Sequence, residues 1–75
     1  MFYFLVIQTF NDGTPTAKAL FDYETMDAAK SALFSNMFSS MANASIKSVL
    51  CEIIDEKEIV LKHEIWERNP EADEE

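Results

Sequence analysis

The sequence predicts an α+β fold in which one helix packs on one face of a four-stranded, mainly antiparallel sheet, in the order β-β-α-β-β. Three observations predict it. Two apolar runs flank an Asp-Gly turn near the start, one helical segment occupies the middle, and a second pair of alternating runs follows. A chain of 75 residues suffices for one small domain, which we place at residues 1–68.

The first two strands are predicted over residues 2–10 and 16–23. β-Branched and aromatic residues dominate the first of them, FYFLVIQTF, and both of its faces are apolar, as in a central strand. The turn between the strands contains Gly13, the only glycine, which adopts a positive φ most easily. In the second strand Leu20 shares a face with Lys18 and Asp22.

The helix is predicted over residues 25–43, with Thr25 as its N-cap. Its large apolar residues form one stripe, which we expect to face the core: Met26, Leu33, Phe34, Met37, Phe38 and Met41. The opposite side carries Ser31, Ser35 and Ser39, and after Lys30 the helix has no charge, in a chain of net charge −8. This neutral side is a candidate contact surface; a weakly polar, solvated face is the alternative.

The last two strands are predicted over residues 45–55 and 58–68, around a turn at 55–57. Whether the third strand pairs with the first or the second is left open. One helix covers only one face of such a sheet, so we expect an uncovered apolar face that marks an interface. The residues predicted there are Phe2, Phe4, Val6, Leu20, Val60 and Trp66.

Catalytic, metal and cofactor sites are not expected. The serines of the helix have no accompanying base, His63 is the only histidine, and one glycine cannot build a phosphate-binding loop. Cys51 is the only cysteine, so it forms no internal disulfide, and its apolar neighbours predict a buried side chain. The sequence therefore favours a protein that is not an enzyme.

Acidic residues outnumber basic ones by 14 to 6, and four of the acids lie in residues 69–75, which we predict to be a disordered acidic tail. Phosphates would be repelled, so direct binding to nucleic acid is not expected. The apolar run at the start is too short to cross a membrane and has no basic flank typical of a signal peptide. A cytoplasmic location is therefore predicted.

Several segments resemble a family of short proteins from gut Firmicutes and from their phages and mobile elements. These segments are FLVIQT, DGTPTAKAL, DYET with the alanines that follow it, VLC, and Glu64-Ile65-Trp66, within residues 3–67. The Ser-rich side of the helix departs from the family pattern. The resemblance implies a small cytosolic accessory protein and no particular activity.

Two main functions are compatible with these observations, besides a weaker third one, a structural part of a phage particle or a component of a toxin–antitoxin pair. The first is a homodimeric interaction module that uses the uncovered sheet face, or the neutral helix side, as its interface. The second is an acidic inhibitor that mimics DNA and occupies the nucleic-acid site of a host enzyme, of the anti-CRISPR or anti-restriction type. Its candidate contacts are acidic residues near the helix start or around the second hairpin: Asp22, Glu24, Asp27, Glu52, Asp55, Glu56 and Glu58.

Overall fold

A computed structural model describes residues 1–68. It contains the strands β1 (Phe2–Phe10), β2 (Ala17–Tyr23), β3 (Ile46–Ile54) and β4 (Val60–Glu67), with the helix α1 (Met26–Ala42) between β2 and β3. The predicted element order and fold class are confirmed. The acidic tail predicted for residues 69–75 lies outside the described residues.

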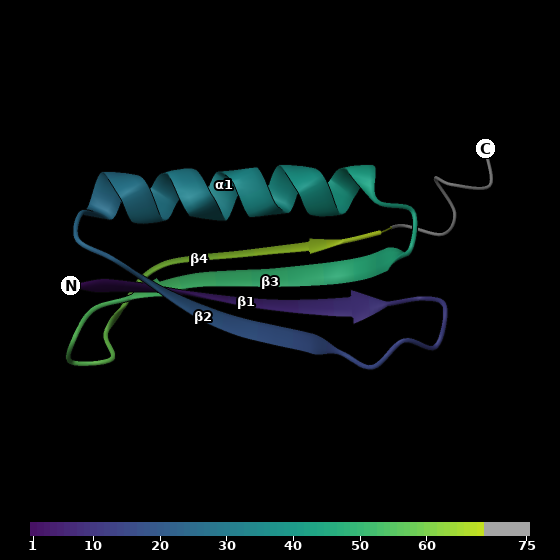
Figure 1. Ribbon diagram of the computed structural model, residues 1–75, viewed down its shortest axis with the longest axis horizontal. Coiled ribbons are helices and arrows are strands. Elements are labelled where there is room, and N and C mark those ends of the chain that lie inside the picture. Colours follow the sequence, from purple (N-terminus) through teal and green to yellow (C-terminus); the bar gives the residue numbers. More distant parts are fainter. Residues whose placement is uncertain (69–75) are drawn as a thin grey trace.

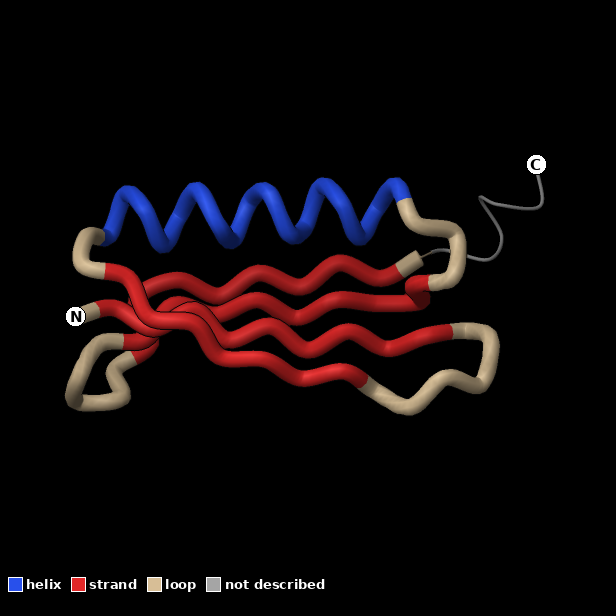
Figure 2. The backbone as a smooth tube through the Cα atoms, viewed as in Figure 1, coloured by secondary structure: helices blue, strands red, loops and turns tan. Residues whose placement is uncertain are grey.

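The strands form one antiparallel sheet in the order β2-β1-β3-β4. β1 is central and pairs with β2 on one side and β3 on the other, which decides the strand order that the sequence left open. β2 and β4 are the two edges. α1 returns the chain from β2 to β3 and lies against one face of the sheet, whereas the loops gather at the two ends of the strands (Figures 1 and 2).

The core lies between α1 and the two central strands. Phe4 and Val6 of β1 and Val49, Cys51 and Ile53 of β3 are buried there against Ala29 and Leu33 of the helix. These sheet side chains fill the space between the sheet and the helix, so small side chains on the helix are enough to contact them. The helix therefore approaches the sheet closely through alanine and serine positions.

Three polar contacts fix the helix on the sheet. Its N-terminus is capped by the Thr25 hydroxyl, which accepts a hydrogen bond of 3.1 Å from the backbone N–H of Ala28. Near its C-terminus the buried Ser40 hydroxyl accepts a hydrogen bond of 3.2 Å from the side-chain amide of Gln8 in β1. Beyond the last turn, the Arg68 guanidinium donates to the carbonyls of Met41 (3.3 Å) and Asn43 (3.1 Å), which otherwise have no partner within the helix.

The predicted core stripe of the helix is confirmed for Leu33, which is buried, and for Met26 and Met37, which pack against the core from partly buried positions, but it is wrong for its other three residues. Phe34, Phe38 and Met41 are exposed, and the buried positions are Ala29, Leu33 and Ser40. Ser40 lies on this buried side, where its hydroxyl accepts the hydrogen bond from Gln8 of β1. Ser31, Ser35 and Ser39 point away from the sheet, as predicted.

Candidate functional site

The face of the sheet opposite α1 carries mostly apolar residues. Within residues 1–68 the only helix lies on the other face, and the loops lie at the two ends of the strands (Figure 2). The position of this face follows from the register, because residues paired across antiparallel strands share a face. We call it the open sheet face. Its apolar residues are Tyr3, Leu5 and Ile7 of β1, Leu20 of β2, Leu50 and Ile54 of β3, and Ile65 of β4.

These residues form a continuous patch across all four strands. Leu5 pairs with Leu20 on one side, and Ile7 pairs with Leu50, which in turn pairs with Ile65. The two edge residues are the most accessible, since Leu20 is 59% exposed and Ile65 is 53% exposed. A patch of this extent on a small domain is typical of a contact surface.

One polar pair lies within the open sheet face. Nδ1 of His63 in β4 is 3.0 Å from Oε2 of Glu52 in β3, and the register places the two residues directly opposite each other. The other charged residues of this face, Lys18, Asp22 and Glu67, lie on the two edge strands. The central part of the face therefore carries little net charge.

The composition predicted for the uncovered face is largely wrong. Phe4 and Val6 are buried under α1, and Phe2 and Trp66 pack against the same core from partly buried positions. β1 is apolar on both faces, so alternation could not decide which face meets the helix. In β4 the face turned toward the helix carries Lys62, Glu64 and Trp66, which an edge strand tolerates because α1 lies mainly over β1 and β3.

Of the predicted residues, Leu20 does lie on the open sheet face. Val60 is exposed and lies opposite Ile54, at a register shift that makes its face irregular. The sequence reasoning missed six residues of this face: Tyr3, Leu5, Ile7, Leu50, Ile54 and Ile65. No sequence signal singles them out, because the residues of β1 on the helix side, such as Phe4 and Val6, also pair with apolar neighbours.

The acidic residues predicted as two alternative contacts lie at one end of the molecule. The turn between β3 and β4 carries Asp55, Glu56 and Glu58, and it lies beside the start of β1 and the end of β2 (Figure 1). Asp22, Glu24 and Asp27 belong to the same end, which we call the acidic end. Glu52 is the exception, because it points into the open sheet face.

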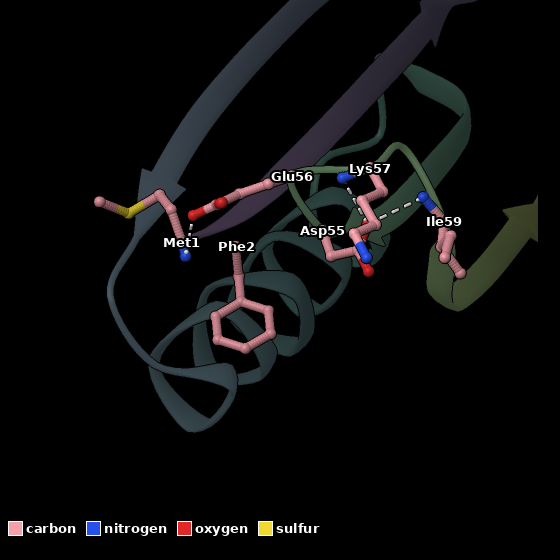
Figure 3. A pocket seen from close by; sticks show the side chains of 6 residues that line it. All are labelled: Met1, Phe2, Asp55, Glu56, Lys57 and Ile59. Atoms are coloured by element: carbon pink, nitrogen blue, oxygen red, sulfur yellow. Dashed lines mark hydrogen bonds and ion pairs between the residues drawn. The ribbon is translucent and has the colours of Figure 1, made fainter.

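Part of the acidic end serves the turn itself. The Asp55 carboxylate accepts hydrogen bonds from the backbone N–H groups of Lys57 (2.8 Å) and Ile59 (3.0 Å), and Glu56 pairs with the terminal amine of Met1 at 2.8 Å (Figure 3). A hollow of about 450 Å³ lies between these residues and Phe2. It is wide and shallow and has no converging polar groups deep inside, so it is not a small-molecule site of the usual kind.

Within residues 1–68 no group of three or more His, Cys, Asp or Glu side chains is placed to hold a metal ion. Burial, with a smaller contribution from the nearby Glu64 carboxylate, raises the pKa of Cys51 to about 11. Its thiolate is therefore scarce at neutral pH, which makes it a poor nucleophile. No helix within the described residues has both the length and the apolar character that a membrane span requires.

No family model matches the chain, and neither the curated proteins nor the solved structures yield a match to it.

Proposed function

We propose that the protein is a non-enzymatic interaction module whose copies pair through the open sheet face. The observation that carries this proposal is the continuous apolar patch on Leu5, Ile7, Leu20, Leu50 and Ile65, which the described chain leaves uncovered. A second copy covers it with a surface of the same chemistry, so two sheets pack face to face with the helices on the outside. The pair has two-fold symmetry, the commonest arrangement of homodimers.

The size of the face fits a small interface. Four strands about 4.8 Å apart and about 26 Å long give a flat area on the order of 500 Å². The side chains that project from the sheet add accessible area to this flat estimate, which brings it closer to the roughly 800 Å² that each partner contributes to a standard interface. We therefore expect a dissociation constant in the micromolar range rather than the nanomolar range.

Charge also favours the open sheet face as the contact. The chain has a formal net charge of −8, so most surfaces of two copies repel each other. On this face the Glu52 carboxylate is already paired with His63, and Lys18 and Asp22 of β2 offset one another. Glu67, the remaining acid of this face, lies at the end of the edge strand β4, so the central part of the face can meet its copy without bringing this carboxylate between the two central strands.

The resemblance to short proteins of gut Firmicutes and their phages supports a role as a cytoplasmic accessory protein. A small module without catalytic groups suits such a role, because it acts by holding copies of itself, or a host protein, together.

The molecular mass in solution tests the proposal. We expect light scattering to give at least 17 kDa, twice the 8.6 kDa of one chain, at concentrations above the dissociation constant. A mass of 8.6 kDa at several hundred micromolar would remove the basis of the proposal.

A second candidate function is that of a DNA-mimic inhibitor, and the specific observation that favours it is the acidic end. Six carboxylates from two separate sequence segments gather there: Asp22, Glu24, Asp27, Asp55, Glu56 and Glu58. Such a cluster steers binding toward a basic groove, with an affinity that falls as salt rises.

Charge-reversal variants test whether binding depends on the acidic end or on the net negative charge of the whole chain. If the inhibitor proposal holds, immobilised protein binds a DNA-processing enzyme of the host at low salt, and duplex DNA displaces the enzyme. Glu24→Lys and Glu58→Lys then weaken the capture, whereas Glu67→Lys, the same charge change at the far end of β4, does not. Equal effects of all three variants, or no displacement by DNA, would contradict this candidate.

A further inference from the structure

The strand β2 has an unpaired side along its backbone. It is the first strand in the order β2-β1-β3-β4, so β1 pairs with one side of it and the other side lies at the edge of the sheet (Figure 1). Within residues 1–68 no backbone group outside β1 bonds to residues 17–23. Every second residue of an edge strand directs its N–H and C=O groups outward, where another strand can pair with them. We call this unpaired side the open edge.

The open edge lacks most of the features that protect an edge strand. Bulges, prolines and several lysines are the usual protections. The seven residues of β2 pair with β1 without a register shift, and Pro15 lies before the strand. Five of the seven residues are exposed, and Lys18 is the only lysine among them. The backbone of β2 is therefore regular and accessible.

The other edge of the sheet is less suitable for pairing. The register between β3 and β4 shifts between Ile53 and Ile54, so the start of β4 is irregular. Nζ of Lys62 in β4 is paired with Glu64 of its own chain at 3.3 Å and lies 5.2 Å from the centre of the Phe34 ring. β4 thus offers a second strand an irregular backbone and charges that already have partners.

The charges of β2 are complementary to those of a second, antiparallel β2. Lys18 and Asp22 lie two residues on either side of Leu20, which is the middle residue of the strand. A two-fold axis beside Leu20 pairs the whole strand with its copy and sets Lys18 of each copy opposite Asp22 of the other. Within residues 1–68 neither of these two side chains has an ion-pair partner in its own chain. Opposite charges in directly opposed positions stabilise an antiparallel pair.

The same charges disfavour the other registers. With the axis beside Ala19 or Phe21, a charged side chain of one copy lies opposite Leu20 of the other. With the axis moved by two residues, two lysines or two aspartates lie opposite each other, which destabilises the pair. Full overlap of the strands and both ion pairs therefore occur together only with the axis beside Leu20.

The other charges of the chain also favour an antiparallel contact. The acidic end lies where β2 ends, near Tyr23. Because the two strands run in opposite directions, the acidic ends of the two copies lie at opposite ends of the pair. Each acidic end then lies beside the turn of residues 11–16 of the other copy, which contains one acid, Asp12. In a chain of formal net charge −8, this arrangement reduces the repulsion between copies.

The helices leave room for the contact. An antiparallel pair of this register continues the sheet, so both α1 helices lie on the same face of it. α1 lies mainly over β1 and β3, which places each helix about 10 Å from the axis at a strand spacing of about 4.8 Å. Two helices about 20 Å apart do not collide, since each is about 10–12 Å across. Between them, Phe21 of each copy, which is 45% exposed, lies opposite Ala19 of the other.

We propose that two copies pair edge to edge through β2, antiparallel and about an axis beside Leu20, to form one continuous eight-stranded sheet. This contact differs from pairing through the open sheet face, because it is made by the backbone at the edge. It leaves the open sheet faces of both copies on the same side. The joined faces double the flat area available for face-to-face packing to on the order of 1000 Å².

Charge-swap variants test the edge contact by sedimentation equilibrium. All of them carry Ile65→Lys, which puts a charge on the open sheet face in β4, away from β2, and so removes face-to-face pairing. We expect this background protein to approach 17 kDa at several hundred micromolar, twice the 8.6 kDa of one chain. Lys18→Asp and Asp22→Lys each raise the dissociation constant at least about 10-fold, because either change sets like charges opposite each other twice.

Mixing the two variants distinguishes specific pairing from an effect of net charge. An equimolar mixture of the Lys18→Asp and Asp22→Lys proteins regains the background affinity, because each chain then meets opposite charges on the other. A chain with both substitutions also pairs as the background does. Net charge alone would make Asp22→Lys strengthen association, since it removes negative charge. Lys47→Asp, the same change at an exposed lysine of β3, is the matched control and leaves the affinity unchanged.

An isotope-filtered nuclear Overhauser experiment on the wild-type protein locates the contact independently of these variants. We expect cross-peaks between the Ala19 methyl group of one copy and the Phe21 ring of another. Both side chains lie on the helix side of the sheet, so pairing through the open sheet face does not bring them together. Circular dichroism confirms that each variant is folded.

The outcomes that overturn the edge contact differ from those that overturn the sheet contact. If the wild type reaches 17 kDa while the Ile65→Lys protein stays at 8.6 kDa, the open sheet face pairs and the edge does not. If both pair equally and both show the cross-peaks between Ala19 and Phe21, the edge contact stands and the sheet contact is absent. Pairing of the background protein that Lys18→Asp and Asp22→Lys leave unchanged also overturns the edge contact.

Discussion

Leu20→Lys weakens pairing through the open sheet face by at least about 100-fold, a loss of roughly 2.7 kcal/mol. Leu20 is exposed in the isolated chain and lies beside Leu5 in the apolar patch. An ammonium group there must be desolvated when two sheets meet, and the two-fold axis places one such group on each copy. Sedimentation at several concentrations measures the change.

Ala17→Lys is the matched control for this variant. It lies in the same strand, is also exposed and adds the same charge, but it lies on the helix side of the sheet, opposite Gln8. We expect its dissociation constant to stay within about a factor of three of the wild-type value, since the charge itself is far from the interface. Equal weakening by the two lysines would show that net charge, and not the open sheet face, governs association.

Phe4→Ala destabilises the folded chain by about 3–5 kcal/mol, most of the stability of a domain of this size. Phe4 is fully buried, stacks on Phe21 with ring centroids 6.2 Å apart, and lies in the cluster that contains Leu33 and Val49. Removing the ring leaves a cavity between sheet and helix that small neighbours cannot fill. Urea unfolding, followed by circular dichroism at low protein concentration, measures the loss.

Leu5→Ala, one residue further along β1, is the informative comparison. Leu5 is half-buried on the open sheet face, so its truncation should cost about 1 kcal/mol in the monomer while it weakens pairing. The sequence-based assignment of Phe4 to the exposed face predicts the reverse order of effects on stability. A larger loss of stability from Leu5→Ala than from Phe4→Ala would contradict the arrangement of β1 described above.

Local sequence patterns were sufficient to predict the elements of this fold. The Asp-Gly turn around Gly13, the N-cap at Thr25 and the β-branched runs define the strands and the helix, because each signal acts over a few residues. The strand order was not predictable in this way. It depends on whether β1 or β2 offers the better partner for β3, and both are rich in apolar residues.

The candidate interface was predicted in kind but not in its residues. One helix can cover only one face of a four-stranded sheet, so an uncovered apolar face is expected whichever face of each strand the helix covers. Which face of β1 meets the helix depends on packing: Phe4 and Val6 fill the layer under α1, and Ala29 lets the helix come close. Alternation in a strand that is apolar on both sides holds no information on that choice.

The helix shows the same limit. Counting large apolar residues correctly selects Leu33, but it also selects Phe34, Phe38 and Met41, which are exposed, and it misses the buried Ser40, which bonds to Gln8. A hydrogen bond between residues 32 positions apart is a tertiary contact, and no local sequence pattern predicts it.

The most direct test of pairing through the open sheet face is an isotope-filtered nuclear Overhauser experiment on a mixture of labelled and unlabelled protein. We predict intermolecular cross-peaks among the methyl groups of Leu5, Ile7, Leu20, Leu50 and Ile65. A sample at several hundred micromolar in which these methyl groups show cross-peaks only within their own chain would contradict the account.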